Sequence, residues 1–337
     1  MHFNYLAKKG MLRLFLQPWM LKSALTFLLI FCMCSLCFSQ AVDTFTSSIG
    51  IIYPDNKGPY RAILAEVISG IEEKSKRAVY KYPLSATSNT REILDQMTQR
   101  NTGAVIALGR EGLGFVPNLT NLKHPIPVIV GGVYSILESE QRTVVGGVSL
   151  IPDPKLFFLN LKTLVPKIRK VVVIYNAKHN DWLMKIAREA ASSHGLMLTA
   201  LEAHDLPTAA RTYAATLQEI NPQQDALWLL QDSTTLEDTI FSLILGESWN
   251  RNLTVFSSNL THVKKGLLFA LYPNNTRMGN TLAKLASDAI SGTATNTIAP
   301  AFFPLQDVDS AINMRTAIHS GIEVKSTHHF DTIFSEQ

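Results

Sequence analysis

Cysteine is the scarcest reactive residue in this chain. It occurs only as Cys32, Cys34 and Cys37, all within an apolar segment near the amino end. Because no cysteine follows Cys37, the remainder of the chain uses neither disulfide bonds nor thiolate chemistry.

Net charge is also nearly absent once the amino-terminal segment is set aside. The chain has 31 Lys+Arg and 27 Asp+Glu, a formal net charge of +4. Four basic residues precede the first acid, Asp43: Lys8, Lys9, Arg13 and Lys22. They account for the whole excess, so the chain from Ala41 onward is neutral. A neutral chain has no electrostatic attraction for nucleic acid or anionic membranes, and we expect neither partner.

Familiar catalytic and metal-binding motifs are missing as well. The sequence has no Gly-x-Ser-x-Gly motif and no P-loop. Residues 109–114 read GREGLG, with glycines in the order GxxGxG, which is not the dinucleotide-binding order. The histidines do not have metal-ligand spacing with nearby acids: His179, His194, His204, His328 and His329. We therefore expect no enzyme, no metal and no cofactor.

The amino-terminal segment is typical of a secretory signal. Basic residues precede an apolar run at 24–38, which at about 15 residues is short for a membrane span. Small residues Ser39 and Ala41 fit cleavage after Ala41, and cleavage after Ser39 is an alternative. A retained anchor helix is one rival interpretation. Lipidation of Cys37 is another, although the preceding Leu36 is large for that signal. We expect no stable membrane span after signal removal.

Strand-like and helix-like segments alternate beyond the signal. The first series predicts strands at 48–53, 79–83, 103–108 and 127–130, with helices at 61–74 and 88–100. The second series predicts helices at 154–164, 181–194, 208–220, 235–250 and 275–291, with strands at 171–175, 197–201, 226–230, 254–257 and 267–272. This order builds parallel sheets with helices on both faces.

We therefore predict an α/β fold of two doubly wound parallel-sheet lobes, with a hinge and an interlobe cleft. The expected organisation is a signal peptide at 1–41, an N-terminal lobe at 42–150, a C-terminal lobe with hinge crossovers at 151–325, and a tail at 326–337. Each lobe opens with a similar segment: residues 49–60 read IGIIYPDNKGPY, and residues 171–182 read VVVIYNAKHNDW. Both have Ile-Tyr followed by a mostly polar stretch and an aromatic residue. The two stretches are expected to be equivalent loops.

An ordered set of short patterns runs through the second half of the chain. They are Gly146-Gly147-Val148-Ser149, Leu164-Val165-Pro166, Val173-Ile174-Tyr175-Asn176, His194-Gly195-Leu196, Asp225-Ala226-Leu227-Trp228 before Asp232, Lys265-Gly266-Leu267, and Asn313 to Ile322 as Asn-x-x-x-Ala-x-x-x-Gly-Ile. In this order and spacing, over roughly 150–325, the set resembles the substrate-binding proteins of bacterial ABC transporters with the type I periplasmic-binding-protein fold. The first lobe agrees in pattern only.

The resemblance implies a small solute, often an amino acid, held between two lobes that close by hinge bending. It also implies delivery to a permease driven by an ATPase, and a periplasmic location in a Gram-negative bacterium. Two segments depart from the family pattern. Residues 131–135 read GGVYS where Asp-Pro-Val is common, and the stretch after Asn176 lacks the usual proline and small residues.

In open parallel sheets, ligands bind beyond the carboxyl ends of the strands. The first-lobe candidates at such positions are Tyr53, Asp55, Asn56, Tyr60, Ser85, Thr87, Gly109, Arg110 and Tyr134. Asp55 would pair with an ammonium group, Arg110 would clamp a carboxylate, and the tyrosines would offer aromatic platforms. The alternatives are a plain turn at Asp55, helix capping by Ser85 or Thr87, and an Arg110–Glu111 pair.

The second-lobe candidates are Tyr175, Asn176, Asp181, Trp182, Asp232, Ser233, Ser258, Asn259 and Tyr272. Trp182 would stack on the ligand or fill the cleft, and Asp232 would meet an ammonium or hydroxyl group. The alternatives are helix capping by Asn180 or Asp181 and core packing of Trp182, while Tyr272 lies nearer the hinge.

We therefore expect an exported solute-binding protein that passes an amino-acid-like, aromatic solute to an ABC permease. The alternative is a periplasmic sensor that presents its ligand to a membrane signalling protein, because both roles need a closing cleft. An exported enzyme is the third and least favoured interpretation.

Overall fold

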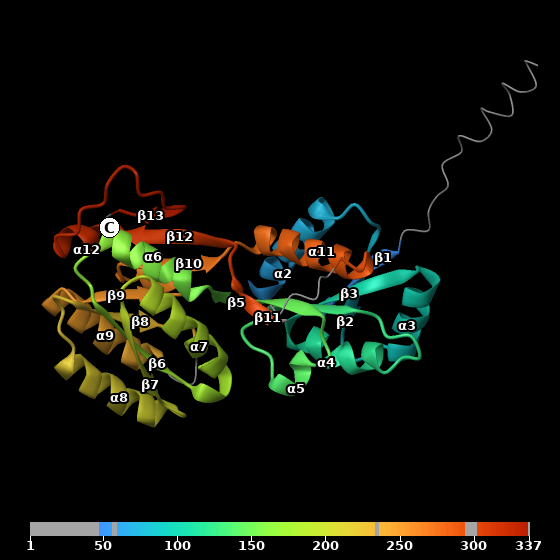
Figure 1. The fold of residues 1–337 in the computed structure, drawn as a ribbon, viewed down its shortest axis with the longest axis horizontal. Coiled ribbons are helices and arrows are strands. Elements are labelled where there is room, and N and C mark those ends of the chain that lie inside the picture. Colours follow the sequence, from blue (N-terminus) through green and yellow to red (C-terminus); the bar gives the residue numbers. More distant parts are fainter. Residues whose placement is uncertain (1–46, 56–58, 233–235, 294–301, 336–337) are drawn as a thin grey trace, which may run out of the picture. The chain divides into compact units, whose positions relative to one another are not determined.

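The computed structural model describes residues 47–55, 59–232, 236–293 and 302–335. Within these ranges helices and strands alternate and assemble into two sheets (Figure 1). The fold is therefore α/β with two mostly parallel sheets, as predicted. The predicted signal segment at 1–41 lies outside the described residues. Among the described helices, none has the length and hydropathy needed to cross a bilayer.

The first sheet has six strands, ordered β11-β5-β4-β3-β1-β2. Each pair of neighbouring strands is parallel. The bounds are β1 Ser48–Pro54, β2 Val79–Leu84, β3 Thr102–Leu108, β4 Val128–Val133, β5 Gly146–Pro152 and β11 Phe302–Leu305. Its central strands are almost continuously apolar, because helices cover both faces.

Two pairs of helices cover the first sheet. Helices α2 (Pro59–Lys74) and α11 (Asn275–Ile290) pack on one face, through a core that includes Ile71 and Leu282. Helices α3 (Thr90–Gln99) and α4 (Gly109–Thr120) pack on the other, through a core that includes Met97 and Leu119. A single turn, α5 (Glu138–Gln141), follows β4.

The second sheet has seven strands, ordered β13-β12-β10-β9-β8-β6-β7. Its bounds are β6 Lys170–Tyr175, β7 Met197–Glu202, β8 Asp225–Leu229, β9 Thr254–Ser257, β10 Phe269–Pro273, β12 Val308–Asn313 and β13 Thr332–Phe334. Strands β6 to β10 are parallel, whereas β12 runs antiparallel to β10. The expected tail at 326–337 therefore contributes an edge strand, β13, beside β12.

Helices also cover both faces of the second sheet. Helices α6 (Pro154–Leu164) and α7 (Ala177–Ser193) pack on one face, around Phe157 and Trp228. Helices α8 (Leu206–Glu219) and α9 (Asp238–Arg251) pack on the other, around Tyr213 and Phe241. The part of the chain that forms the second sheet also contains two short helices, α10 (Leu260–Lys264) and α12 (Met314–His319).

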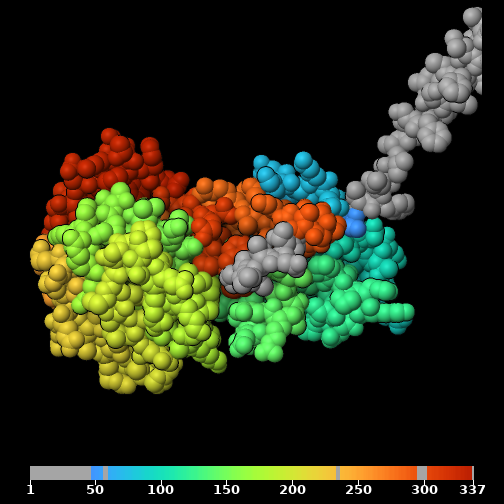
Figure 2. All heavy atoms as spheres, viewed as in Figure 1, coloured from blue at the N-terminus to red at the C-terminus, as the bar shows by residue number. Residues whose placement is uncertain are grey.

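Helix α11 does not belong with the second sheet, where the sequence placed it. It packs on α2, which covers the first sheet, so the two helices lie side by side although about 200 residues separate them. In Figure 2 the orange atoms of α11 abut the blue atoms of α2. Contact is at backbone distance: a Cβ on Gly70 would overlap the Thr276 carbonyl, and one on Gly279 would overlap the Val67 carbonyl.

The chain passes between the two sheets three times. It leaves the first sheet after β5, returns after β10, and crosses again between β11 and β12. Backbone hydrogen bonds tie these passages together: the Asp153 N–H donates to Leu305 O (2.9 Å), and the Asn274 N–H donates to Asp307 O (2.9 Å). The predicted junction near 145–154 is only the first passage. The second lobe, expected as one run at 151–325, is interrupted by α11 and β11.

Candidate functional site

Two predicted residues, Tyr60 and Gly109, meet Gly132 where β1, β3 and β4 end. The Tyr60 hydroxyl donates a hydrogen bond to Gly132 O (2.8 Å), and Gly109 lies against both. Gly109 (φ +72°) and Gly132 (φ +69°) have left-handed backbone, which favours glycine. Burial raises the pKa of the Tyr60 hydroxyl, with the negative charge of Glu111 acting in the same direction, so Tyr60 is a neutral donor. Tyr60 thus joins the start of α2 to β4.

A cavity of about 570 Å³ lies beside this cluster, at the ends of β1 and β2. Asp55 and Glu111 bring carboxylates to its lining, and Ser85 brings a hydroxyl group. Asp55 is exposed, and its N–H donates to Leu84 O (2.8 Å). Carboxylates beside hydroxyl groups suit an ammonium or a hydroxylated group. Two predicted residues, Asp55 and Ser85, therefore share one hollow.

The predicted capping of α3 by Ser85 or Thr87 is wrong. Their hydroxyl groups lie 3.1 Å apart in an exposed turn that includes Ser88. The Asn89 side chain caps the helix instead, because it accepts from the Arg91 and Glu92 N–H groups.

Arg110 is held by a partner other than the predicted Glu111. Its guanidinium donates to Ser135 O (2.6 Å) and lies 3.6 Å from the Glu140 carboxylate. These contacts use some of its five N–H donors and join α4 to the segment after β4. Tyr134, in that segment, is 41% exposed. Tyr53 packs partly buried against the first core, and Asn56 lies outside the described residues.

The second opening differs from the prediction, because the expected loop after β6 is helix. Helix α7 begins at Ala177, four residues before the predicted start at 181. Asn176 caps it by accepting from the Lys178 N–H (3.0 Å), and its amide donates to His204 O (3.3 Å). Asn180 and Asp181 therefore lie inside the helix and do not cap it, and Asp181 pairs with Lys185 on the exposed side (3.1 Å).

Buried polar groups gather where β8 and β9 end. The Asn180 amide donates to the Asp232 carboxylate (2.8 Å), and Asn180 is buried. Ser258 follows β9 and lies beside β8, because its N–H donates to Leu229 O (3.3 Å). Ser258 is 4% exposed, and its hydroxyl has no hydrogen-bond partner among the described residues. Since an unpaired buried hydroxyl costs free energy, Ser258 is a candidate contact for a ligand or water.

Trp182 contacts the cores of both sheets. It packs against the cluster around Trp228 and also against the cluster around Met97. Its ring meets Phe302 of β11 edge-on, with ring centroids 5.5 Å apart, and its indole N–H donates to His179 O (3.1 Å). Core packing, the predicted alternative, therefore describes this side chain, although it remains partly exposed.

Three further candidates have structural partners, and one lies outside the described residues. Tyr175 is 6% exposed within the second core, so little of its side chain is open to a ligand. Asn259 caps α10 by accepting from the Thr261 N–H (2.9 Å). Tyr272 shares a hydrogen bond with Thr332 (2.9 Å). Ser233 is outside the described residues.

A serine–histidine pair lies next to Ser258, but the serine is inaccessible. Ser257 Oγ is 2.7 Å from His262 Nδ1, and Ser257 is fully buried (0% exposed). Ser257 Oγ also accepts from the Asn259 N–H (3.1 Å). Burial lowers the pKa of His262 to about 4, and the charge of Lys265 adds to that shift. The pair stabilises the turn after β9.

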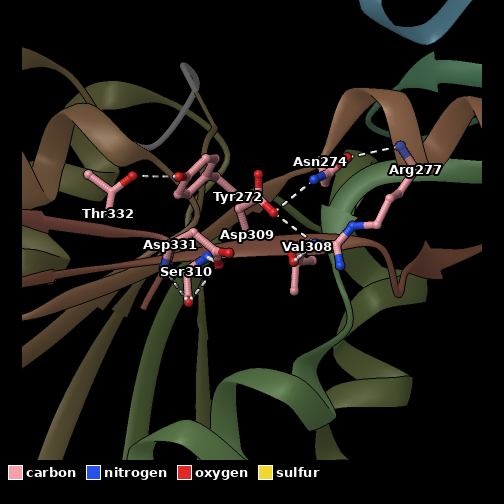
Figure 3. A network of polar contacts seen from close by, with 8 residues as sticks. All are labelled: Tyr272, Asn274, Arg277, Val308, Asp309, Ser310, Asp331 and Thr332. Atoms are coloured by element: carbon pink, nitrogen blue, oxygen red, sulfur yellow. Dashed lines mark hydrogen bonds and ion pairs between the residues drawn. The ribbon is translucent and has the colours of Figure 1, made fainter. Parts of the chain in front are cut away.

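A polar network holds two of the passages between the sheets together (Figure 3). Asp309 of β12 accepts from Asn274 (2.9 Å) and from Arg277 of α11 (2.7 Å), while Arg277 also reaches Val308 O (2.6 Å). Ser310, the next residue of β12, donates its N–H to the Asp331 carboxylate (2.7 Å), and that hydrogen bond lowers the Asp331 pKa. The network therefore lies at the crossover itself, where a hinge would bend.

Sequence reasoning considered Asn180 only as a helix cap and Glu111 only as a partner of Arg110, and it missed this network. Each depends on packing between segments far apart in the chain, such as Arg277 with Asp309. Within the described ranges, no group of three or more His, Cys, Asp or Glu residues is placed to hold a metal ion.

The chain is similar to known proteins both in sequence family and in fold. A family profile described as ABC transporter substrate binding protein matches residues 64–327. No curated protein matches the chain. A ligand-free, open substrate-binding protein from Clostridium difficile is similar in fold (TM-score 0.59, 16% identity, 86% of this chain and 100% of that chain). So are a conserved domain protein from Vibrio cholerae (0.51, 17%, 86% and 99%) and an ABC domain from Streptococcus pneumonia in complex with L-Trp (0.50, 15%, 86% and 100%).

Proposed function

Because the chain belongs to the ABC transporter substrate-binding protein family, we propose that it captures a small solute and delivers it to an ABC permease. The observation that carries this proposal is the family match over residues 64–327, which spans elements of both sheets. Export across the cytoplasmic membrane to the periplasm, after removal of residues 1–41, is part of the proposal. Amino-terminal sequencing of protein recovered from the host periplasm would test it, and a chain that still begins at Met1 would contradict it.

We propose an amino-acid-like solute, with an aromatic side chain as the favoured case. On the first sheet, Asp55 and Glu111 line one hollow and would meet an ammonium group, and Arg110 nearby would meet a carboxylate. Tyr134 is exposed enough to stack on a ring. The described complex of the Streptococcus structure with L-Trp is consistent with this class, although the likeness is one of fold.

On the second sheet, the proposed contacts are Asp232 and Ser258. The orphan Ser258 hydroxyl would gain a hydrogen bond from the solute, and Asn180 orients the Asp232 carboxylate. A solute that touches both sheets stabilises only the arrangement in which both sets of contacts form. That differential binding is what allows a ligand to close two lobes.

The test is a thermal-shift screen of unliganded protein against amino acids and small metabolites, followed by calorimetry of any hit. Binding to the native state must raise the melting temperature. Asp55→Asn should weaken a hit roughly tenfold through loss of a charge-assisted hydrogen bond, whereas Glu73→Gln, at an exposed position on α2, should leave affinity unchanged. Absence of any shift, in folded and ligand-free protein, would refute the proposal.

A further inference from the structure

A second cavity, larger than the one beside Asp55, lies against helix α9. Its volume is about 830 Å³, and its lining comes from α9, α10, the segment after α10, α12 and the strand β13. Pockets for small organic ligands fall between about 300 and 1,000 Å³. The cavity is therefore of a size that a small molecule fills, and the proposed solute contacts do not include any of its lining residues.

The sheet topology separates this cavity from the proposed solute contacts. The cavity lining includes Asn313, at the end of β12, and Gly266, shortly before β10 begins. Because β12 is antiparallel to β10, with Ile312 opposite Phe269, both positions lie at the amino ends of the parallel strands. Asp232 and Ser258 follow the carboxyl ends of β8 and β9. The two regions therefore lie at opposite ends of the second sheet.

The lining is positively charged. Lys264, Lys265 and Arg315 contribute to it, and among the residues that the structure describes no aspartate or glutamate lines it. Lys265 lies 3.4 Å from Asp238, but both side chains are largely exposed (49% and 96%), so water screens this pair. Lys264 and Arg315 make no ion pair within the described part of the chain. Three cations thus border one hollow, and the described part of its wall contains no acid.

An aromatic side chain holds one of these cations in place. The Arg315 guanidinium lies over the Trp249 ring, 4.9 Å from its centroid. His319, one helical turn along α12, stacks on Trp249 at 3.7 Å and 4°, and its Nε2 lies 2.9 Å from Trp249 O. Stacking of this kind orients a guanidinium while leaving its N–H edges available to a carboxylate or phosphate. The cation is therefore positioned by α9 and α12 together.

The carboxyl-terminal strand completes the wall. Ile333 and Phe334 line the cavity, and both lie beyond residue 327, where the family match ends. They add apolar surface to the lining, together with Leu245 of α9. A ligand for this hollow needs an anionic group and an apolar body. Because β13 supplies part of the apolar wall, this feature depends on a segment outside the matched family region.

From the cavity, its aromatic wall, and the two lining cations that form no ion pair within the described residues, we infer a second binding site for a small organic anion, in which a carboxylate or phosphate meets Arg315 and Lys264 and an apolar group meets Trp249 and Phe334. The site is independent of the solute site proposed above, so it stands even if that proposal fails.

The experiment uses the full chain and two probes that share an aromatic ring, phenylacetate and phenyl phosphate, in calorimetric titrations at low salt. Binding should be detectable, should weaken as salt is raised, and should change the fluorescence of Trp249. Arg315→Gln should weaken binding roughly tenfold, and Lys264→Gln roughly threefold to tenfold, by loss of charge-assisted hydrogen bonds. Comparing the two probes decides between carboxylate and phosphate.

The matched control is Lys123→Gln, which removes one positive charge at an exposed position between α4 and β4. It should bind both probes as the unaltered chain does. Folding of each variant is checked by its melting curve, and the two independent substitutions guard against failure of either one to fold. The inference is overturned if neither probe binds at millimolar concentration, or if Lys123→Gln weakens binding as much as Arg315→Gln does.

Discussion

The two lobes open with segments that look alike in sequence but fold differently. After β1 the chain leaves the strand at Asp55, and α2 begins only at Pro59. After β6 the helix starts at once, with Asn176 as its cap and Ala177 as its first residue. The aromatic residue seven positions after the tyrosine is therefore in the first turn of α2 as Tyr60, but in the second turn of α7 as Trp182.

Local chemistry explains this difference. The first segment reads Pro-Asp-Asn-Lys-Gly-Pro, and its last residue, Pro59, suits the first position of a helix, where α2 begins. The second reads Asn-Ala-Lys-His-Asn-Asp, which supplies an N-cap followed by residues compatible with helix. Equal spacing between aromatic residues is thus a weaker guide to a shared loop than the residues between them. Tyr60 consequently bonds the backbone of β4, whereas Trp182 packs into both cores.

The largest expected effect on stability concerns how closely helices pack beside each of the two sheets. Gly279→Ala should destabilise the protein by about 3 kcal/mol, because a Cβ there overlaps the backbone of α2. Gly246→Ala, in α9 of the second layer, meets nothing within 4 Å and should stabilise by about 0.5–1 kcal/mol through helix propensity. Denaturant unfolding measures both. Equal effects of the two substitutions would show that α11 does not contact α2 closely.

The next prediction concerns the two openings. Asn176→Ala should cost about 1–2 kcal/mol of unfolding free energy, because it removes the cap of α7 and leaves His204 O without this donor. Asp55→Ala should change stability by less than about 0.5 kcal/mol, because Asp55 is exposed and begins no helix. Urea titrations of both variants provide the measurement. A cost at Asp55 that matches the cost at Asn176 would mean that the openings are equivalent after all.

Acid should affect the second lobe more than the first. His262 is neutral in the folded state with a pKa of about 4, against about 6.5 when unfolded. The unfolded chain therefore binds more protons between these values, so stability is fully present above pH 6.5 and is lost as pH falls towards 4. Allowing for solvent screening of a partly exposed group, the loss is about 1–2 kcal/mol.

This prediction is checked by measuring unfolding free energy at pH 7 and pH 4.5 in the unaltered chain and in His262→Gln. The variant should lose less stability on acidification than the unaltered chain does. The control is His124→Gln, at an exposed position of the first layer, which should retain the full pH dependence. An unchanged pH dependence in His262→Gln would contradict the neutral, buried assignment.

The smallest effect is expected at the passages between the lobes. Arg277→Gln removes the 2.7 Å pair with Asp309, and both residues are partly exposed (50% and 24%), so the expected cost is about 0.5–1 kcal/mol. Lys81→Gln breaks a pair of similar geometry within the first layer, at 2.8 Å from Glu72, and should cost no more than about 0.5 kcal/mol. Small-angle scattering should distinguish them, because only the Arg277 variant should alter the distribution of interlobe geometries.

Much of the fold could be predicted from the sequence, because it depends on local periodicity. Apolar runs such as 103–108 and helical stripes such as that of α2 gave the element order. The order of elements does not determine which sheet a helix covers. Helix α11 follows a strand of the second sheet, yet its small residues, above all Gly279, fit the backbone of α2. That preference is visible only in three dimensions.

For the candidate site, the sequence indicated which residues follow the strand ends, but it did not indicate which residues their side chains contact. The structure has Asp55 and Ser85 at one cavity, and Asp232 and Ser258 at adjacent strand ends, and their role as solute contacts stays a prediction. The sequence could not indicate that Tyr175 points into the core, or that Arg110 is held by Ser135 and Glu140. Such pairings depend on contacts across the sheet, and neither periodicity nor spacing encodes them.

The placement of α11 and β11 also bears on how the chain acquires its structure. One face of the first sheet remains without half of its cover until residues 275–305 have been synthesised, long after the residues of β1 to β5. Contacts between such distant segments slow folding, and a nascent first lobe would expose Ile71 and its neighbours meanwhile. The amino-terminal lobe therefore cannot complete its packing before residues 275–305 are available.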